Sequence, residues 1–474
     1  MKKEESIIVK IKVIDSIMGT GKTSWAIQEM LANPDESYIY CTPFLDEVRR
    51  IKEKCKHKRK FYDPQRIDGK KIEGFNHLLE SGKDIVLTHS TFSNSNQETL
   101  ENLAQGNYCL ILDEVLDILV KFNDVAQKKL DKGDPSVLVR EKFITVDDYG
   151  RVTWIKDTCP NAAYSDVERL AKSGNLFYLD HTMLVWQFPP QIFKLFKKVY
   201  VLTYLFEGSF LKPYFEYHNL LYDRVSVNKS QSGIYSLVPY SREQEQIQRD
   251  FYKGLIKICN NESINDDYRA KSLSKTWYER ASKEKKNQLQ HNIANFVRNI
   301  AKAKASEIMW SCPKAYIKAL KGRGYTQIFK VTPEMPMINC PHCNKILSHL
   351  VNQCPECGYK ISVDKEWVAD EKRRLEKISQ CFVPCNARSS NDFADRWVCA
   401  YAMNMYPNPY VKRYFTNKNA KENLSITVDE DYFALGCMLQ WIWRSRIRNN
   451  KPIHVYIPSA RMKKLLMDWL DSKM

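Results

Sequence analysis

The chain has no apolar run approaching the roughly 18 to 20 residues that a membrane-spanning helix needs. Its first residues, Met-Lys-Lys-Glu-Glu-Ser, lack the apolar core and the small-residue cleavage site of a secretory signal peptide. Most of its 14 cysteines are scattered in apolar stretches, such as Cys41, Cys109 and Cys437. We therefore expect a cytoplasmic protein whose cysteines are reduced and, apart from one cluster, mainly core residues.

Acidic residues are too few to balance the basic ones. The 73 Lys and Arg against 56 Asp and Glu leave a formal charge of +17, which favours a polyanionic partner. At 474 residues the chain exceeds one ordinary core, so two or three domains are expected. Ten Trp and 26 Tyr indicate a packed globular protein, not a disordered one.

The first motif follows an apolar alternating run, Ile7 to Ile14, that predicts a strand. A Gly-rich turn from Asp15 to Thr23 comes next, and residues 24–31 have helical spacing. Strand, Gly-rich turn ending in Lys-Thr, and helix are typical of a phosphate-binding (Walker A) loop. The backbone N–H groups and the helix N-terminus would bind phosphate oxygens. Ser16 stands where the usual loop has its first glycine.

The loop predicts a nucleoside triphosphate site. Lys22 would reach the β- and γ-phosphates, and Thr23 would offer its hydroxyl to Mg²⁺. The candidate nucleotide-binding residues are Gly19, Thr20, Gly21, Lys22, Thr23 and Ser24.

A second motif, Asp113-Glu114, ends the continuous apolar run 109–112. An acidic residue there can hold Mg²⁺, and its neighbour can orient or deprotonate the attacking water. A solvated strand end is the alternative. Similar apolar runs at 37–41 and 84–88 alternate with helices, which predicts a parallel sheet with functional groups at the carboxyl ends of its strands.

The cysteine cluster consists of two Cys-x-x-Cys knuckles separated by ten residues: Cys340, Cys343, Cys354 and Cys357. In a reducing compartment this spacing predicts a structural zinc site. The zinc module would either contact nucleic acid or protein, or only staple a long loop.

The rest of the chain predicts further helices and a second sheet. Polar stretches with helical spacing fill residues 240–305, and strands are expected at 308–312, 380–385 and 454–457. A very apolar helix over 432–443 ends in Arg444.

Taken together, these segments resemble a superfamily 2 (DEAD/DEAH-like) helicase. The family order is present: the phosphate loop 15–23, a Thr-Pro segment at 41–44, Thr-His-Ser at 88–90, Asp113-Glu114, Leu-Thr-x-Leu at 202–205, Asn-Ala-Arg at 386–388 and Gln-x-x-x-Arg at 440–444. Residues 386–391 and 439–448 further look like helicase-type proteins of phages and prophages.

The resemblance implies an α/β fold with two RecA-like parallel-sheet lobes, a helical insertion and a small zinc-ribbon insertion in the second lobe. The corresponding domains are 1–215 for the ATP-binding lobe 1, with an insert at about 120–175, and a mainly helical linker at 216–305. Lobe 2 would occupy 306–474, with the zinc ribbon at about 335–362.

The resemblance also implies roles for single residues. Gln440, Arg444 and Arg448 would face ATP across the cleft. The usual spacing places the second arginine where this chain has Ile447, so Arg446 or Arg448 must serve, and Arg448 is favoured.

Further threonines and a serine would act on nucleic acid. Thr203 would couple the ATP site to the strand groove, while Thr42, Thr88 and Ser389 would donate hydrogen bonds to backbone phosphates.

The expected function is an ATP-dependent nucleic-acid helicase or translocase using ATP, Mg²⁺ and Zn²⁺, serving phage DNA replication or recombination. Single-stranded DNA is favoured over RNA as partner, replication proteins are possible partners, and no membrane is involved. Two alternatives stay open: an ATPase switch that remodels or loads a nucleoprotein complex without unwinding, and a zinc-ribbon nucleic-acid-binding regulator with a degenerate ATP site.

Overall fold

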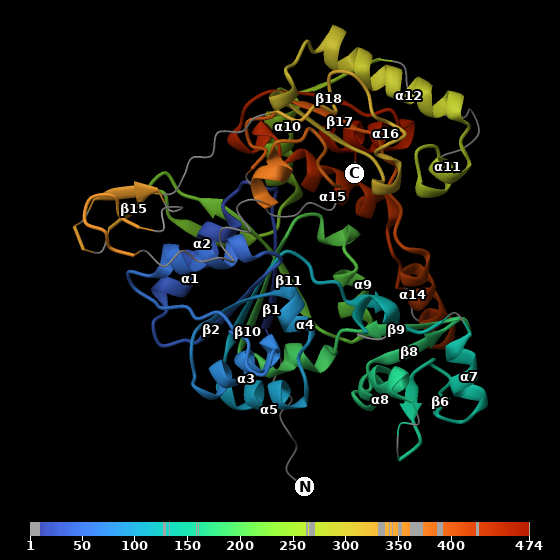
Figure 1. Cartoon of the computed structure of the whole chain (residues 1–474). Coiled ribbons are helices and arrows are strands. Elements are labelled where there is room, and N and C mark those ends of the chain that lie inside the picture. Colours follow the sequence, from blue (N-terminus) through green and yellow to red (C-terminus); the bar gives the residue numbers. More distant parts are fainter. Residues whose placement is uncertain are drawn as a thin grey trace. The chain divides into compact units, whose positions relative to one another are not determined.

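The computed structural model describes residues 10–126, 129–131, 133–157, 159, 161–261, 264, 271–329, 337–340, 342–343, 345–348, 353–360, 373–385, 392–422 and 426–473 (Figure 1). The chain forms two compact units. Unit 1 comprises Met1–Arg249 and Met405–Cys437, and unit 2 comprises Asp250–Asn404 and Met438–Met474. The domain boundaries predicted from the sequence stay predictions.

Unit 1 is built on a seven-stranded sheet of order β12-β11-β1-β10-β4-β2-β3, parallel except for β12, which pairs antiparallel with β11. Its strands are β1 Lys10–Asp15, β2 Tyr38–Thr42, β3 Ile85–Thr88, β4 Cys109–Asp113, β10 Lys198–Thr203, β11 Tyr222–Lys229 and β12 Tyr235–Pro239. Its helices include α1 Lys22–Ala32, α2 Leu45–Cys55, α3 Lys71–Glu80, α4 His89–Ser93, α5 Gln97–Gly106, α9 Leu211–Tyr217 and α10 Arg242–Lys253, whose last residues belong to unit 2.

Both faces of this sheet are buried, because successive side chains of a strand point to opposite sides. Val13 and Leu112 lie in one core cluster, with Phe75 and Phe92. Ile14 and Ile111 lie in another, with Trp25 of α1. Coverage on both faces explains the continuous apolar strands of the sequence.

A small α/β module lies between β4 and β10 in the chain. It holds a three-stranded antiparallel sheet of order β5-β9-β8 and the hairpin β6-β7. Its elements are β5 Leu119–Lys121, α6 Phe122–Val125, α7 Asp134–Arg140, β6 Ile144–Val146, β7 Val152–Trp154, α8 Ser165–Lys172, β8 Leu176–Leu179 and β9 Met183–Gln187. The apolar run Leu176–Leu179 therefore forms a strand of this separate sheet and not of the seven-stranded one.

Helix α14, Pro409–Glu422, completes the module from a distant part of the chain (Figure 1). Its Tyr414 ring lies 5.6 Å from that of Phe177, and its Tyr410 hydroxyl donates to the Leu119 carbonyl at 3.1 Å. Arg413 pairs with Asp180 at 2.8 Å.

Unit 2 contains a four-stranded parallel sheet of order β13-β18-β17-β14. Its strands are β13 Ile256–Ile258, β14 Ile308–Ser311, β17 Val398–Tyr401 and β18 Ile453–Tyr456, and its helices include α11 Lys275–Arg280, α12 Lys283–Asn295 and α16 Ala460–Leu470. Helix α15, Glu430–Ile442, begins in unit 1 and ends in unit 2. The segment 380–385 is not a strand: it makes two isolated bridges, a parallel one from Phe382 to Trp310 of β14 and an antiparallel one from Gln380 to Ile328.

Unit 2 also carries the hairpin of β15 Met337–Asn339 and β16 Ile346–Ser348. Cys340 and Cys343 lie between its two strands in the sequence, and Cys354 and Cys357 follow it. The predicted α/β class with two parallel sheets is thus confirmed, and so is the four-cysteine cluster in the second unit. Among the described residues, no helix combines the length and apolarity needed to cross a membrane.

Candidate nucleotide site and cysteine cluster

The Gly-rich loop joins β1 to α1 with the backbone that its glycines predict. Gly19 and Gly21 have φ of +85° and +99°, a region that glycine enters without steric penalty. The Gly21 carbonyl accepts the N–H of Trp25 at 2.8 Å and so starts the helix. Gly21 is also crowded: a Cβ there would lie 2.2 Å from the ring of Tyr235 on β12.

Ser16, the departure from the usual loop, ties the loop to its neighbours. Its hydroxyl accepts the N–H of Val227 on β11 at 2.9 Å, and its own N–H donates to the Thr203 carbonyl at 3.2 Å. A glycine could not make the first of these bonds. The hydroxyl therefore has a structural use in this chain.

Lys22 begins α1 and turns back over the loop. Its Nζ donates to the carbonyl oxygens of Ser16 and, at 3.1 Å, Ile17. Burial lowers the pKa of Lys22 to about 8, while the carboxylates of Asp15, Asp113 and Glu114 act to raise it. Those carboxylates are therefore close enough to the lysine to affect its charge.

Asp113 and Glu114 follow β4 at the same edge of the sheet. Asp15 is in register with Thr203, and Leu202 with Asp113, so β1, β10 and β4 end together. Glu114 has φ of +67°, and its N–H donates to the Leu202 carbonyl at 3.0 Å, so the chain turns sharply there.

The electrostatics of Asp113 suit a cation site. Burial and then the Glu114 carboxylate raise the pKa of Asp113 to about 7. The hydroxyl of Tyr40 on β2 opposes this by donating to Oδ2 of Asp113 at 2.7 Å. A divalent cation would neutralise both carboxylates at once.

A buried polar network that the sequence did not predict extends from Asp15. Asp15 is buried, and its Oδ2 accepts hydrogen bonds from Nε and Nη2 of Arg224 at 2.8 and 2.7 Å. Arg224 lies on β11, with its guanidinium 3.6 Å from the centre of the Tyr240 ring. Burial raises the pKa of Asp15, and Arg224 opposes the rise.

The network continues through Glu245 on α10. Glu245 accepts the hydroxyls of Tyr240 and Tyr204, each at 2.5 Å, and Nη2 of Arg249 at 2.6 Å. Tyr204 directly follows Thr203, the predicted coupling residue. One chain of hydrogen bonds and stacked charges thus connects three parts of unit 1. These are the phosphate loop, the segment that follows β10, and helix α10.

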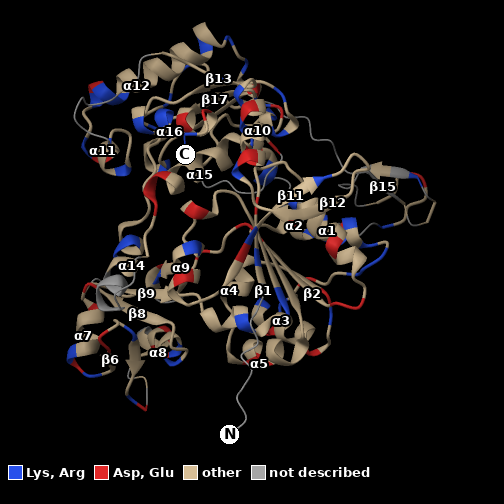
Figure 2. Ribbon diagram, turned by 180° about the vertical axis from the view of Figure 1, so that it is seen from behind, with Lys and Arg blue, Asp and Glu red and all other residues tan. Residues whose placement is uncertain are grey.

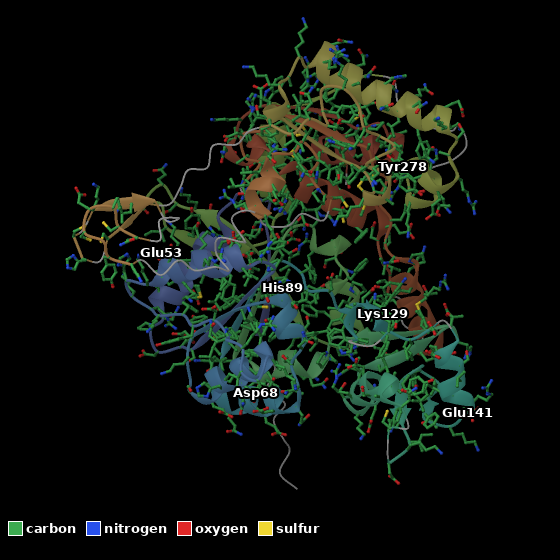
Figure 3. The ribbon with its side chains drawn as sticks, in the orientation of Figure 1. Glu53, Asp68, His89, Lys129, Glu141 and Tyr278 are labelled. Carbon is green, nitrogen blue, oxygen red and sulfur yellow. The ribbon has the colours of Figure 1, made fainter. Side chains whose placement is uncertain are left out.

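The predicted nucleic-acid residues of unit 1 lie at the same edge of the sheet, where Thr42 of β2 pairs with Thr88 of β3. Thr42 is buried, as is Thr203. Thr88 caps α4, its hydroxyl accepting the Thr91 N–H at 3.4 Å, and α4 begins at His89, labelled in Figure 3. Ser389 and the whole Asn-Ala-Arg motif lie outside the described residues.

Gln440 and the arginines belong to the part of the chain assigned to unit 2. Gln440 lies in the last turn of α15, Arg444 follows it and is 5% exposed, and Arg448 lies in a short 3₁₀ turn. Arg446 is engaged within the unit: its Nε donates to the Pro452 carbonyl at 2.6 Å, and its guanidinium lies 5.4 Å from the Trp397 ring.

The four cysteines converge as their spacing predicts. All four sulfur atoms lie within 4.8 Å of one another, with 3.5 Å between Cys340 and Cys357 and 3.6 Å between Cys343 and Cys354. Tetrahedral zinc with Zn–S bonds of about 2.3 Å requires sulfurs about 3.8 Å apart. The cluster therefore fits a zinc ion.

Comparison with family models identifies two regions. Residues 250–470 match the YonV C-terminal Rossmann-like domain, and residues 125–186 match the YonV middle domain. The first match covers most of unit 2 with its parallel sheet, and the second covers most of the small module.

Among solved structures, an XPD helicase is similar over 98% of this chain and 95% of its own, with 11% identity and a TM-score of 0.47. The S. tokodaii Xpd4 structure is similar over 97% and 94%, with 12% identity and a TM-score of 0.45. These TM-scores lie below 0.5, so the architecture rests on the chain's own strand order.

A full-length relative decides the family. The SPbeta prophage-derived uncharacterized protein YonV of Bacillus subtilis (strain 168) is 34% identical over 98% of this chain and 99% of its own length. The predicted resemblance to prophage proteins is thus confirmed. This chain belongs to the YonV family.

Proposed function

We propose that this protein is an ATP-dependent nucleic-acid translocase or helicase of the superfamily 2 type. The observation that carries the proposal is the meeting of Lys22 with Asp113 and Glu114 at the ends of β1 and β4. A cation for phosphate and an acidic pair for Mg²⁺ and water are the two halves of an ATPase site.

In this proposal the loop binds the triphosphate and the acidic pair serves hydrolysis. Backbone N–H groups of Gly19, Thr20 and Gly21, with Ser24 beside them, surround the phosphates, and Lys22 exchanges its carbonyl partners for phosphate oxygens. Thr23 and Asp113 hold Mg²⁺, which neutralises phosphate charge when bound. Glu114 orients the attacking water.

Unit 2 supplies the remaining catalytic groups in this proposal. Gln440, Arg444 and Arg448 contact the nucleotide when the two lobes close, which couples hydrolysis to lobe motion. Arg448 is the second arginine in this proposal, as the comparison with the family spacing favours. Thr203 transmits the state of the site to the nucleic-acid groove.

The proposed track is single-stranded nucleic acid, DNA in preference to RNA, serving phage replication or recombination. The charge of +17 supports a polyanionic partner. Thr88 and Ser389 contact backbone phosphates, and Thr42 does so if its buried hydroxyl becomes exposed.

The test is ATP hydrolysis by wild type and Lys22→Ala, with and without single-stranded DNA and RNA. We expect turnover stimulated by one nucleic acid and lowered roughly 10²- to 10³-fold in the variant. Lys172→Ala, which removes an exposed lysine paired with Glu168, is the matched control. Absence of turnover in wild type under all conditions contradicts the proposal. Turnover without displacement of a duplex strand would instead indicate an ATPase switch.

We propose zinc as the ion held by the four cysteines, with the ribbon as an additional nucleic-acid or protein contact. Purified protein should contain one zinc per chain by metal analysis, and Cys354→Ser should lose it, because structural sites need all four ligands. Cys399→Ser, a change at a buried cysteine outside the cluster, should retain the metal. A metal-free wild type would contradict the assignment.

A further inference from the structure

A basic hollow lies at the end of unit 1 opposite the phosphate loop. It has a volume of about 330 Å³, and its lining includes Lys58, Arg59, Lys60, Tyr62, Lys83 and Asp84. Leu31 and Pro34, at the end of α1, complete one wall. Lys22 begins that helix, and Leu31 follows it by nine residues. At a rise of 1.5 Å per residue, the wall of the hollow at Leu31 lies about 14 Å along the helix from Lys22. It is therefore separate from the nucleotide site.

The frame of the hollow is rigid. Arg59 is 6% exposed in its side chain and donates to Asp84, the Glu36 carbonyl and the Asn33 carbonyl, each at 2.7 Å. Tyr62 is held beside β3, because its N–H donates to the Asp84 carbonyl and its carbonyl accepts the Val86 N–H, both at 2.9 Å. The ion pair with Arg59 neutralises the carboxylate of Asp84.

The three lysines that line the hollow differ from Arg59, because none of them forms a described ion pair. Within the described part of the chain, Lys58, Lys60 and Lys83 have no carboxylate within ion-pair distance. Lys60 and Lys83 both approach the Tyr62 ring, with Nζ 4.9 and 5.9 Å from its centre. Two ammonium groups at one ring repel each other, and an anion between them would relieve that repulsion.

Neighbouring cations on α2 provide the contrast. Arg49 pairs with Asp46, Arg50 with Glu47, Lys52 with Asp63 and Lys56 with Glu53, which Figure 3 labels. In Figure 2, blue segments (Lys and Arg) and red segments (Asp and Glu) lie close together near the α1 and α2 labels. Among the residues that the structure describes, four of the five basic side chains from Arg49 to Lys56 thus have a carboxylate partner, and so does Arg59, whereas the three lysines of the hollow have none.

We propose that this hollow binds phosphate groups and is distinct from the ATP site and independent of hydrolysis. A volume near 300 Å³ is at the lower end for small-molecule sites and suits one nucleotide unit. Ammonium groups bind phosphate as point charges. The phosphate comes either from the backbone of a nucleic-acid strand or from a small free phosphate, and the experiment separates these sources.

The experiment compares wild-type full-length protein with a triple variant, Lys58→Gln, Lys60→Gln and Lys83→Gln. The control variant carries Lys172→Gln, Lys412→Gln and Lys464→Gln, which removes the same charge from exposed lysines that have carboxylate partners. Binding of a fluorescein-labelled dT20 oligonucleotide is followed by anisotropy over a series of salt concentrations. Binding of inorganic pyrophosphate is followed by calorimetry.

If the hollow binds a nucleic-acid strand, we expect the triple variant to bind dT20 at least tenfold more weakly than the control variant. The slope of log affinity against log salt should fall by about 2, because each phosphate contact contributes about 0.7. Loss of pyrophosphate binding alone would assign the hollow to a small phosphate. Equal behaviour of the two variants in both titrations overturns the proposal.

The ATPase proposal can fail without affecting this result. The Lys22→Ala variant keeps the hollow, so it should bind dT20 with the affinity of the wild type. The triple variant keeps the ATP site, so it should hydrolyse ATP at the wild-type rate in the absence of nucleic acid. All three lysines are exposed, so the substitutions leave the core unchanged.

Discussion

Tyr40 is the residue that adjusts the charge of the proposed cation site. Its ring is buried within β2, and its hydroxyl reaches Asp113 across the edge of the sheet at 2.7 Å. This hydrogen bond favours the ionised carboxylate, against burial and Glu114, which together raise the pKa of Asp113 to about 7.

Tyr40→Phe should therefore raise the pKa of Asp113 further. We expect the acid limb of kcat/KM for ATP, which reports the free enzyme, to lie near pH 7 and to move up by roughly half to one unit. Tyr38→Phe, on the same strand but bonded to Glu36, is the control. An unshifted limb in Tyr40→Phe would contradict this account of Asp113.

Arg224 is the counterion of the most buried carboxylate at the site. Arg224→Met leaves Asp15 without its cation, and breaking such a pair typically costs about 3–5 kcal/mol of unfolding free energy. Because burial raises the pKa of Asp15, the loss should shrink as the pH falls and the carboxyl takes up a proton. Urea unfolding at pH 7 and at acid pH measures both effects.

The double variant Asp15→Asn with Arg224→Met provides the check. It removes the buried charge together with its partner, so much of the lost stability should return. A double variant less stable than Arg224→Met alone would show that the carboxylate has another favourable partner.

At the scale of elements, the segment after β10 packs tightly against the start of α15. A Cβ on Gly208 would lie 2.3 Å from the Tyr432 carbonyl carbon and 2.5 Å from the Phe433 nitrogen, both backbone atoms that cannot turn away. Phe210 stacks on Phe433 with 4.8 Å between ring centres. The segment carrying Thr203 is therefore held against a helix that continues toward Arg444.

Gly208 at this contact and Gly436 farther along α15 should respond to alanine with opposite signs. Gly208→Ala should lower the free energy of unfolding by roughly 1–3 kcal/mol through overpacking. Gly436→Ala, inside α15 with no atom within 4 Å of the new Cβ, should raise it by up to about 1 kcal/mol through helix propensity. Thermal unfolding of both variants measures the difference, and a stable Gly208→Ala would show that the contact can open.

The elements that could be predicted from the sequence are those with strong local patterns. The phosphate loop, the apolar strands and the two knuckles each carry their signal within a few residues. β11 was missed because its alternation is weak and its side chains are mostly half-exposed. β17 was missed because a four-residue apolar run has no distinctive flanks, and 380–385 was predicted as a strand although Pro384 cannot donate to a ladder.

The missed site residues share one cause. Arg224 bonds Asp15 across 209 positions of sequence, and Tyr235 meets Gly21 only because β12 adds to the sheet beside α1. No local pattern contains such pairs. The one available hint is that Arg224 directly precedes the short alternating segment Val225-Ser226-Val227.

At the scale of the whole molecule, the two units are interleaved along the chain. Unit 1 is completed by Met405–Cys437, whose α14 places Val411, Tyr414 and Phe415 in the same core cluster as Phe177. The sequence-based boundaries contain no such return, because helical spacing alone does not reveal which core a helix joins.

A fragment of residues 1–249 should therefore be poorly soluble, because the apolar surface covered by α14 is exposed. The same fragment joined to 405–437 through a flexible Gly/Ser linker should be soluble and unfold cooperatively. Soluble yield and thermal unfolding compare the two. Equal stability of the short fragment would show that α14 is dispensable.

This interleaving also orders events during translation. The phosphate loop is synthesised before the segment Met405–Cys437 that completes its unit, and that segment follows most of the second unit, Asp250–Asn404. Domains usually mature in the order of synthesis, N-terminal first. Here the first unit must wait, so the nascent chain passes through a long period in which its oldest part is made but unfinished and open to chaperones.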